Sequence, residues 1–499
     1  MSYSVSLLLP VVGWRDREGR VAAFGKPDKG GQHSPTFLRF DHDLVNSYLL
    51  PSMRRSTRFL LSSRPTTLSG RRYSSQLAVT CPAPHFFKSV REGQIPAFRV
   101  LDTEGKVADD VEQAWREKAG QIERDKLEKM MRTMSLLPLL DQILYSSQRQ
   151  GRISFYMTSY GEEGAVVGSA AAWENDDEVF AQYREVGVLL WRDFPLSSLM
   201  AQVFSSASDK ATLGRQMPVH YGSPEHHFHT ISSPLGTQIP QAAGAAYALK
   251  RTPGRENSCV ICYAGEGATS EGDFHAGLNM ASVLGGPVVF FIRNNGFAIS
   301  TPASQQYAGD GIAARGPGYG IETVRVDGND PLAVYLACKE ARRKAVKGKK
   351  PVLVEAMTYR VGHHSTSDDS SAYRSLDAVD SIKKLDSPLF RLRRYLESRS
   401  PPLWSAAIDD STKSAHKHAI LREFQKAEKE RKPPLEAMFA DVFAKVEDRG
   451  EDGDGTGLER PQREQRDELK RLVEKWGETE AWKNELEKFE GGRDAVLKW

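Results

Sequence analysis

The sequence predicts an α/β protein with a doubly wound parallel sheet, an N-terminal arm and C-terminal helices. Between residues 151 and 361, short runs rich in β-branched and aromatic residues alternate with stretches of helical periodicity. This alternation is typical of a parallel sheet that is covered by helices on both faces. The expected strands are 258–264, 287–292, 322–326 and 352–357, and the expected helices between them are 274–284 and 331–346.

Four regions follow one another along the chain. We expect an N-terminal extension with a targeting segment at 1–91, a packing arm at 92–150, the α/β domain at 151–385 and a charged helical region at 386–499. The arm begins with a strand-like stretch at 96–101 and continues with apolar residues near helical spacing from 111 to 145. An acidic, Gly-rich stretch at 447–461 is expected to be a disordered loop.

Composition excludes several classes of protein. The chain has 499 residues, of which 39% are hydrophobic and 27% charged, as in an ordinary globular protein. The formal net charge of +3 gives no reason to expect nucleic acid as a partner. The longest apolar runs, such as 5–9 and 288–292, are far shorter than the roughly 18–20 residues that span a bilayer, so we expect no membrane insertion. Four cysteines are too few for a disulfide framework and indicate a reducing compartment.

The N-terminal extension indicates import into mitochondria. Residues 53–91 contain Arg, Lys, Ser and Thr but no acidic residue, which is typical of a mitochondrial presequence. Residues 71–75, Arg-Arg-Tyr-Ser-Ser, resemble a matrix-peptidase cleavage site with the cut after Tyr73. Because residues 1–52 contain several acidic residues, we expect Met53 to be the true start. The predicted location is the mitochondrial matrix, and the alternative is a disordered basic tail.

Polar residues follow three of the predicted strands. Gly265-Glu266-Gly267 follows the first, Arg293-Asn294-Asn295-Gly296 the second, and Arg360 with His363-His364 a third. Ligands of open parallel sheets bind at the carboxyl ends of strands. A carboxylate and an amide oxygen there suit Mg²⁺, which commonly takes few protein oxygens and substrate phosphates as ligands.

The spacing of thirty residues between Gly265 and Asn295 resembles the thiamin diphosphate motif, in which Gly-Asp/Glu-Gly is followed after about thirty residues by Asn-Asn. Either half alone could be an ordinary turn, whereas both halves in a strand–helix–strand context favour a cofactor site. The resemblance implies the thiamin diphosphate-binding fold. It also implies that Mg²⁺ is bound by Glu266, Asn295 and the main-chain carbonyl of Phe297.

Further motifs resemble one family over about residues 92–490. They are Tyr183-Arg184-Glu185, 214–220, 232–235, 309–320 and 363–375. Together they resemble the α subunit of the E1 component of the branched-chain 2-oxoacid dehydrogenase complex. The loop 363–375 favours this family over the pyruvate dehydrogenase α subunits, which are the nearest alternative. A non-catalytic regulatory subunit is a third reading, and the acidic stretch near 448–461 departs from the family pattern.

The resemblance assigns residues to the cofactor. Tyr183 and Arg184 would contact the diphosphate together with Arg293, Ser233 and Leu235 would flank the aminopyrimidine, and Gly265 and Gly267 would let the backbone approach the ligand. Gln182 would line the pocket for the 2-oxoacid. Ser232, Pro234, Thr237 and Gln238 match the K⁺ site of the family. The alternative for residues 232–237 is an ordinary helix N-cap.

His364 is the residue that we expect to move protons or orient the intermediate, with Ser233 and Gln182 in the same catalytic set, because an imidazole with a pKa near neutrality suits that role. The alternative is that one of His363 and His364 is only structural. Ser365 and Ser375 match phosphorylation sites of the family. A phosphate would add a charge of about −1.5 to −2 and is expected to disorder this loop.

The resemblance also implies partners and a reaction. Only one doubly wound domain is predicted, so the carboxylate that activates the aminopyrimidine must come from an E1 β subunit in an α2β2 heterotetramer. The expected enzyme is a 3-methyl-2-oxobutanoate dehydrogenase, which decarboxylates the 2-oxoacids of valine, leucine and isoleucine oxidatively. Its acyl group would pass to the lipoyl arm of the E2 dihydrolipoyl acyltransferase core, under control of a kinase and a phosphatase.

Three other features have simpler interpretations. Cys259 and Cys262 lie within an apolar strand and are expected in the core. His226, His227 and His229 lack a matching set of Cys or acidic residues, so they are expected to make polar contacts near the site entrance. The basic run 342–350 is expected to be a solvated helix face.

Overall fold

The computed structural model describes residues 80–84, 95–439 and 460–499. The chain divides into two units, Met1–Arg71 and Arg72–Trp499, and every described residue belongs to the second. The predicted cleavage site and start therefore lie outside the described residues. The same holds for residues 447–459 of the predicted acidic loop, whereas residues 460 and 461 begin a helix.

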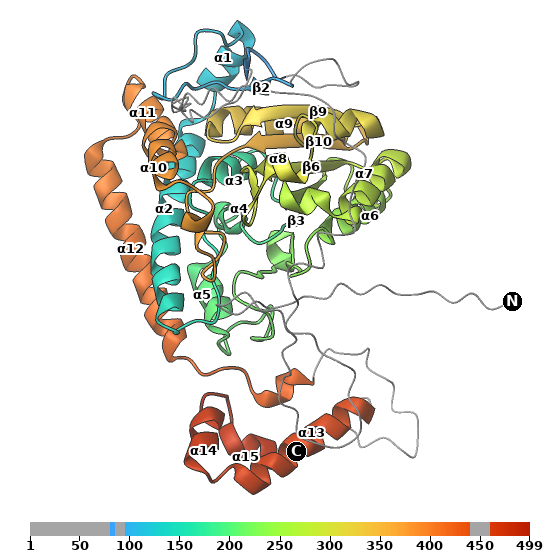
Figure 1. Ribbon diagram of the computed structural model, residues 1–499, viewed down its shortest axis with the longest axis vertical. Helices are drawn as coiled ribbons and strands as arrows, with labels where there is room; N and C mark the ends of the chain where they lie inside the picture. Colours follow the sequence, from blue (N-terminus) through green and yellow to red (C-terminus); the bar gives the residue numbers. More distant parts are fainter. Residues whose placement is uncertain (1–79, 85–94, 440–459) are drawn as a thin grey trace, which may run out of the picture. The chain divides into compact units, whose positions relative to one another are not determined.

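A parallel sheet of eight strands forms the centre of this unit, in the order β1-β2-β9-β10-β6-β5-β3-β4 (Figure 1). This confirms the predicted fold class. The strands are β1 (Thr80–Cys81), β2 (Ala97–Phe98), β3 (Glu178–Phe180), β4 (Phe228–His229), β5 (Val260–Gly265), β6 (Val288–Asn294), β9 (Glu322–Asp327) and β10 (Val352–Met357). An antiparallel pair, β7 (Phe297–Ala298) and β8 (Thr301–Pro302), follows β6.

The helices of the described residues connect and cover these strands. They are α1 (Gln113–Gly120), α2 (Arg124–Arg149), α3 (Glu163–Ala170), α4 (Val186–Trp191), α5 (Leu196–Phe204), α6 (Gln238–Leu249), α7 (Gly272–Leu284), α8 (Ala303–Gln306), α9 (Pro331–Gly348), α10 (Leu376–Leu385), α11 (Pro388–Ser398), α12 (Ala406–Lys429), α13 (Arg460–Trp476), α14 (Glu480–Leu486) and α15 (Gly492–Leu497). Short 3-10 turns lie at η1 (Pro224–His226), η2 (Gly267–Ser270), η3 (Ala313–Tyr319), η4 (Ser370–Ala372) and η5 (Leu435–Met438). None of the described helices is both long enough and apolar enough to span a bilayer.

The periodicity from 111 to 145 belongs to two helices rather than one. The backbone of Glu123 is extended, with ψ near 140°, so α1 ends and α2 starts anew at Arg124. Helices α13 to α15 form a small core of their own around Val473, Leu486 and Val496.

The central strands are buried on both faces, as alternate residues of β5 show. Ile261 and Tyr263 belong to a core shared with α2, α3 and α9, whereas Val260 and Ala264 belong to a core shared with α6 and α7. Cys259 and Cys262 are free thiols that are fully buried in these two different cores. This confirms that they are core residues and not a redox or metal pair.

The parallel arrangement brings the chemically important segments together. In the register of the sheet, Gly265 at the end of β5 is opposite Arg293 in β6, and Met357 at the end of β10 is opposite Asn294. The carboxyl ends of β3, β5, β6 and β10 therefore open on one edge of the sheet, where a doubly wound protein binds its ligands.

Candidate active site

A cavity of about 360 Å³ lies at this edge of the sheet. Twelve residues that the sequence assigned to the cofactor, the substrate or Mg²⁺ line it, namely Gln182, Tyr183, Arg184, Ser233, Leu235, Gly265, Glu266, Gly267, Arg293, Asn295, Phe297 and His364. Its lining does not include the residues of the predicted K⁺ site or the predicted phosphorylation sites Ser365 and Ser375.

Glu266 has the properties of a ligand for a cation. Its side chain is buried, Oε1 has no hydrogen-bond partner, and Oε2 lies 3.4 Å from the backbone nitrogen of Asn295. Burial raises the pKa of Glu266 to about 7. The described residues contain no cluster of three or more His, Cys, Asp or Glu side chains that could hold a metal. A cation here would therefore need amide, carbonyl and phosphate oxygens besides Glu266, which is the donor set that Mg²⁺ accepts.

Two glycines shape the backbone around Glu266 and Asn295. Gly296 has a φ of +84°, in the left-handed region that favours glycine, and turns the chain from β6 into β7. A Cβ atom on Gly267 would lie only 2.7 Å from that of Ala298. The absence of a side chain at Gly267 thus lets the end of β5 pack directly against β7, which carries Phe297.

Arg293 is held by two buried carboxylates. Its Nε donates to Oε1 of Glu185 over 2.6 Å, and its Nη1 donates to Oε2 of Glu162. Burial by itself would lower the pKa of Arg293, but Glu185 and Glu162 raise it above its usual range. The sequence assigned Arg293 to the diphosphate. Because the described hydrogen bonds use Nε and Nη1, the group that it can offer to a ligand is Nη2.

The imidazole of His364 lies against two arginines in this structure. Its Nδ1 lies 3.2 Å from Nη2 of Arg184 and 3.1 Å from Nη1 of Arg360. A guanidinium can only donate, so Nδ1 accepts and the proton resides on Nε2. Burial, together with Arg184 and Arg360, lowers the pKa of His364 to about 3. The expectation of a pKa near neutrality was therefore wrong, because two neighbouring cations oppose protonation.

The loop after β10 is fixed around His364. Oδ2 of Asp368 accepts from the backbone nitrogen of His364 over 2.8 Å and from the hydroxyl of Tyr373 over 2.6 Å. His363 has a different role, because its Nδ1 accepts from the backbone nitrogen of Ser370 over 3.0 Å. Unlike His364, His363 is absent from the lining of the cavity.

Gln182 and Ser233 approach the cavity from other segments. Oε1 of Gln182 accepts from the backbone nitrogen of Gly265 over 2.8 Å, which ties the end of β3 to the end of β5. Oγ of Ser233 lies 2.7 Å from Nε2 of His220. Nδ1 of His220 lies 3.1 Å from the carbonyl oxygen of Pro218, so this nitrogen carries the proton and Nε2 accepts from Ser233.

Several lining residues were not assigned from the sequence. They are Phe155, Met157, Met217 and His220, with Ala268, Glu271, Ala298 and Ile299. Arg360 also lines the cavity, and the sequence had named it only as a polar residue after a predicted strand. His220 and Met217 lie inside the quoted motif 214–220, which was the available signal for them. Phe155 and Met157 precede α3 and have no motif of their own, so only the fold brings them to the cavity.

The residues of the predicted K⁺ site lie at the start of α6. The hydroxyl of Thr237 donates to the carbonyl oxygen of Pro234 over 3.2 Å, and Nε2 of Gln238 donates to that of Tyr263 over 3.0 Å. Thr237 precedes the helix but its side chain makes no capping hydrogen bond.

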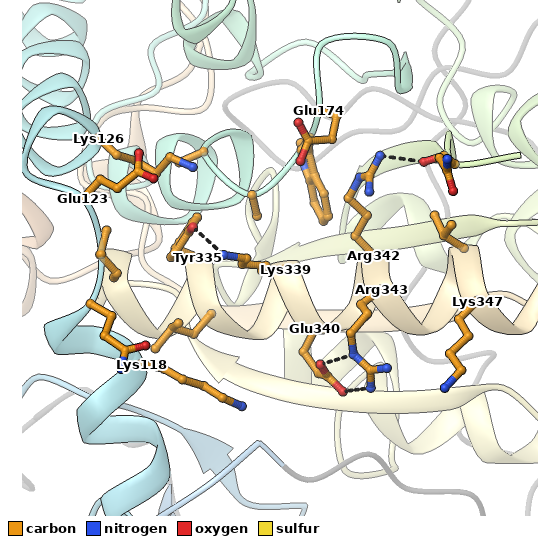
Figure 2. Close-up of a pocket in the computed structure, with 18 of the residues that line it drawn as sticks. Lys118, Glu123, Lys126, Glu174, Tyr335, Lys339, Glu340, Arg342, Arg343 and Lys347 are labelled. Atoms are coloured by element: carbon orange, nitrogen blue, oxygen red, sulfur yellow. Dashed lines mark hydrogen bonds and ion pairs between the residues drawn. The ribbon is translucent and has the colours of Figure 1, made fainter. Parts of the chain in front are cut away.

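A larger hollow of about 950 Å³ lies elsewhere, along α9 (Figure 2). None of the predicted site residues lines it. Arg343 pairs with Glu340, and Lys339 donates to the hydroxyl of Tyr335 over 3.3 Å. Arg343 and Lys347 are exposed, as predicted for a solvated helix face. Arg342 departs from that prediction, because its side chain is only 16% exposed and pairs with the buried carboxylate of Asp177 over 2.7 Å.

The three clustered histidines make polar contacts, as predicted, but none of them lines the cavity. His227 and His229 both approach the carboxylate of Glu178 at the start of β3, at 3.0 and 3.1 Å. His226 lies 2.7 Å from the hydroxyl of Ser223.

Residues 131–436 match the family described as the dehydrogenase E1 component. This chain belongs to that family, whose members depend on thiamin diphosphate. It is 56% identical over 352 residues to the mitochondrial 2-oxoisovalerate dehydrogenase subunit alpha of Homo sapiens. The aligned region covers 70% of this chain and 77% of the relative. The corresponding subunit of Caenorhabditis elegans is 50% identical over 349 residues, 70% of this chain and 78% of the relative. These matches confirm the resemblance seen in the motifs. The relatives are mitochondrial proteins, which agrees with the mitochondrial location that the basic N-terminal segment predicts for this chain.

A plant relative extends the same comparison. The mitochondrial 2-oxoisovalerate dehydrogenase subunit alpha 1 of Arabidopsis thaliana is 48% identical over 350 residues, which is 70% of this chain and 72% of the relative. Similarity to this one kind of subunit thus extends across animals and plants.

Proposed function

We propose that this chain is the α subunit of the E1 component of a branched-chain 2-oxoacid dehydrogenase complex. In that role it decarboxylates the 2-oxoacids of valine, leucine and isoleucine and passes the acyl group to the lipoyl arm of E2. The observation that carries the proposal is Glu266, whose buried and unpartnered Oε1 lies in the cavity where the predicted cofactor residues converge. The similarity to 2-oxoisovalerate dehydrogenase subunits supports the choice of substrate.

The cavity residues fit Mg²⁺ and the diphosphate of the cofactor. Glu266, Asn295 and the carbonyl oxygen of Phe297 would hold Mg²⁺, while Tyr183, Arg184 and Nη2 of Arg293 would hold the diphosphate. When bound, thiamin diphosphate supplies the electron sink for the loss of CO₂. Ser233, oriented by its hydrogen bond to His220, and Leu235 would flank the aminopyrimidine.

His364 would act on the substrate through its Nε2–H group. Because Nδ1 accepts from Arg184 and Arg360, the imidazole stays neutral and presents Nε2–H as a donor. A donor aimed at an oxygen on which negative charge develops stabilises the transition state more than the ground state. Gln182 would bind the 2-oxoacid from the end of β3.

A potassium ion at the start of α6 would serve the cofactor site indirectly. Ser232, Pro234, Thr237 and Gln238 supply hydroxyl, carbonyl and amide oxygens, and residues 232–238 lead directly from Ser233 and Leu235 into the helix. An ion bound there would fix the segment that flanks the aminopyrimidine.

An E1 β subunit would cover the mouth of the cavity and complete it in an α2β2 heterotetramer. Exposed apolar side chains lie both on the outer face of α7 and at the rim of the cavity, namely Met280, Val283, Leu284, Leu235 and Ile299. Val283 is 77% exposed. Val283 and Leu284 lie three and four residues after Met280 along α7 and so share one face of this helix with it, which we take as a surface for the partner. A kinase would phosphorylate Ser365 and Ser375, and the charge at Ser365 would act on the loop that holds His364.

The proposal is tested with the chain assembled with its candidate β subunit. We expect decarboxylation of 2-oxoisovalerate that requires both thiamin diphosphate and Mg²⁺ and exceeds the decarboxylation of pyruvate. A preference for pyruvate would assign the chain to the pyruvate dehydrogenase α subunits. An inactive but cofactor-loaded tetramer would indicate a non-catalytic regulatory subunit.

A further inference from the structure

We propose that Glu162 is a positioning residue that holds the amide of Asn295 with its oxygen toward Mg²⁺. The inference rests on the proposed function, because it assumes that Asn295 is a metal ligand. Glu162 precedes α3 and lies 133 residues before Asn295 in the chain. No sequence motif assigned it a role.

The contacts of Glu162 are few and completely buried. The side chain is 0% exposed, Oε1 accepts from Nδ2 of Asn295 over 2.8 Å, and Oε2 accepts from Nη1 of Arg293. Arg293 supplies the positive charge that a buried carboxylate needs. Both oxygens of Glu162 are thus committed to two residues that line the cavity.

The carboxylate determines which end of the Asn295 amide faces the cavity. An ionised carboxylate only accepts hydrogen bonds, so the side of Asn295 that meets Glu162 must be the NH₂ group. Oδ1 then lies on the other side, where it accepts from the backbone nitrogen of Phe297 over 3.2 Å. A carbonyl oxygen has a second lone pair, and this one remains for a cation beside Glu266.

Without the carboxylate, the Asn295 amide keeps the 3.2 Å hydrogen bond from the backbone nitrogen of Phe297 to Oδ1 but loses the shorter contact that holds its NH₂ group. A rotation by about 180° would turn Nδ2 toward the cation, and an NH₂ group cannot bind a metal ion. Residues that orient a metal ligand through a hydrogen bond typically change metal affinity by about 10- to 100-fold when they are replaced.

The primary test measures Mg²⁺ affinity in the α2β2 protein at saturating thiamin diphosphate, by isothermal titration calorimetry. We expect Glu162→Gln to weaken Mg²⁺ binding by about 10- to 100-fold. Its side-chain oxygen would still accept from Arg293, while its NH₂ group would face Asn295 and favour the rotated amide.

Glu185→Gln is the matched control. Glu185 is also 0% exposed and also accepts from Arg293, but its other oxygen accepts from the backbone nitrogens of Gln182 and Arg184 and not from Asn295. We expect turnover to fall in both variants, so the comparison rests on Mg²⁺ affinity. Glu185→Gln should bind Mg²⁺ within about threefold of the unmodified protein.

A compensating variant separates orientation from loss of charge. In Glu162→Gln combined with Asn295→Asp, the NH₂ group at position 162 can donate to one oxygen at position 295, and the second oxygen can face the cation. We expect Mg²⁺ affinity to return to within about fivefold of that of the unmodified protein. Thermal unfolding of each variant shows whether the tetramer has remained folded.

Two results would overturn the inference. One is Mg²⁺ binding by Glu162→Gln within twofold of the unmodified protein. The other is an equal loss in Glu162→Gln and Glu185→Gln with no recovery in the compensating variant, which would assign the effect to Arg293 or to charge. If the unmodified tetramer bound neither Mg²⁺ nor thiamin diphosphate, the proposed function itself would fail.

Discussion

Two buried arginine clusters stand at the carboxyl ends of neighbouring parts of the sheet, and only one of them belongs to the candidate active site. Arg293 lies near the end of β6 and is held by Glu162 and Glu185, with exposed side-chain fractions of 2%, 0% and 0%. Arg391 in α11 is held near the end of β9 by Asp327 and Asp386, with exposed fractions of 2%, 3% and 3%. In burial and charge the two triads are nearly equivalent.

The difference lies in the third carboxylate near each arginine. Beside Arg391, Asp330 accepts from four backbone nitrogens, those of Val100, Leu101, Leu332 and Ala333, at 2.5 to 3.1 Å. Beside Arg293, Oε1 of Glu266 has no partner. A buried acceptor that remains unsatisfied costs stability, and this one belongs to a residue that lines the cavity where the predicted cofactor residues converge. In the Arg391 cluster every carboxylate oxygen has a hydrogen-bond partner, whereas Nε of Arg391 has none. The Arg391 cluster joins the N-terminal arm to α9, while the unpartnered carboxylate oxygen beside Arg293 is arranged to bind a ligand.

The strongest test of this comparison is Glu266→Gln. We expect turnover of 2-oxoisovalerate to fall by at least about 100-fold, the upper end of what loss of a residue supporting a metal costs. At the same time, the cofactor-free protein should unfold at the same temperature or higher, because a buried and poorly paired carboxyl is replaced by a neutral amide. Turnover and thermal unfolding measured on one preparation check both parts. Full activity would remove Glu266 from the site.

Asp330→Asn is the isosteric counterpart in the other cluster. The amide keeps one acceptor and loses the other, so two backbone nitrogens lose their partner at a cost of about 1–3 kcal/mol each. We expect a lower free energy of unfolding by roughly this amount and unchanged affinity for Mg²⁺. Urea unfolding and calorimetry measure the two quantities. Weakened Mg²⁺ binding in a folded protein would show that the two clusters are not independent.

The sequence predicted the central strands of the fold and many residues that line the cavity. It did not predict the hydrogen bonds between residues that lie far apart in the chain. Strands β5, β6, β9 and β10 are long and strongly patterned, so their runs were visible. Strands β3 and β4 have three and two residues and are strands only because β3 pairs with β5 and β4 pairs with β3. A motif can carry ligands that are close in the chain. It cannot reveal Glu162, whose partner Asn295 lies 133 residues away in the chain. Nor can it reveal the low pKa of His364, which results from burial and from Arg184, 180 residues away.

Added charge should affect two serines of one loop differently. Ser365 lies three residues before Asp368, whose carboxylate already holds His364 and Tyr373, so a second negative charge there would repel it. Ser375 is exposed and immediately precedes α10, where the free backbone N–H groups of a helix start favour negative charge. We expect Ser365→Glu to lower turnover by about tenfold or more, whereas Ser375→Glu should change it by less than about twofold.

These two variants are compared in steady-state turnover, with Ser365→Gln and Ser375→Gln as uncharged controls. The sequence predicted that a phosphate at either position would disorder the loop. Equal losses in the two Glu variants would support that prediction and contradict the distinction drawn from the structure.

The smallest expected effect concerns a buried carboxyl next to the Arg293 cluster. Glu163 is 1% exposed, and both of its oxygens accept from one backbone nitrogen, that of Gly161. Burial raises the pKa of Glu163 from 4.5 to about 8. The folded protein therefore holds this proton more tightly than the unfolded chain. The contribution of Glu163 to stability is complete below about pH 4.5 and is lost as the pH rises through about 8.

Glu163→Gln removes this titration and keeps a neutral side chain of the same size. We expect its unfolding temperature to decline less between pH 5 and pH 8 than that of the unmodified protein, with a difference of a few degrees at most for a chain of this length. The matched control is Glu256→Gln, because Glu256 is exposed and its pKa is lowered by its own backbone N–H and that of Gly254, so it titrates below this range. Parallel pH curves for Glu163→Gln and the unmodified protein would mean that Glu163 is ionised when folded. In that case a raised pKa would not be common to the buried carboxyls near Arg293. Glu266 alone would then distinguish the Arg293 cluster from the Arg391 cluster.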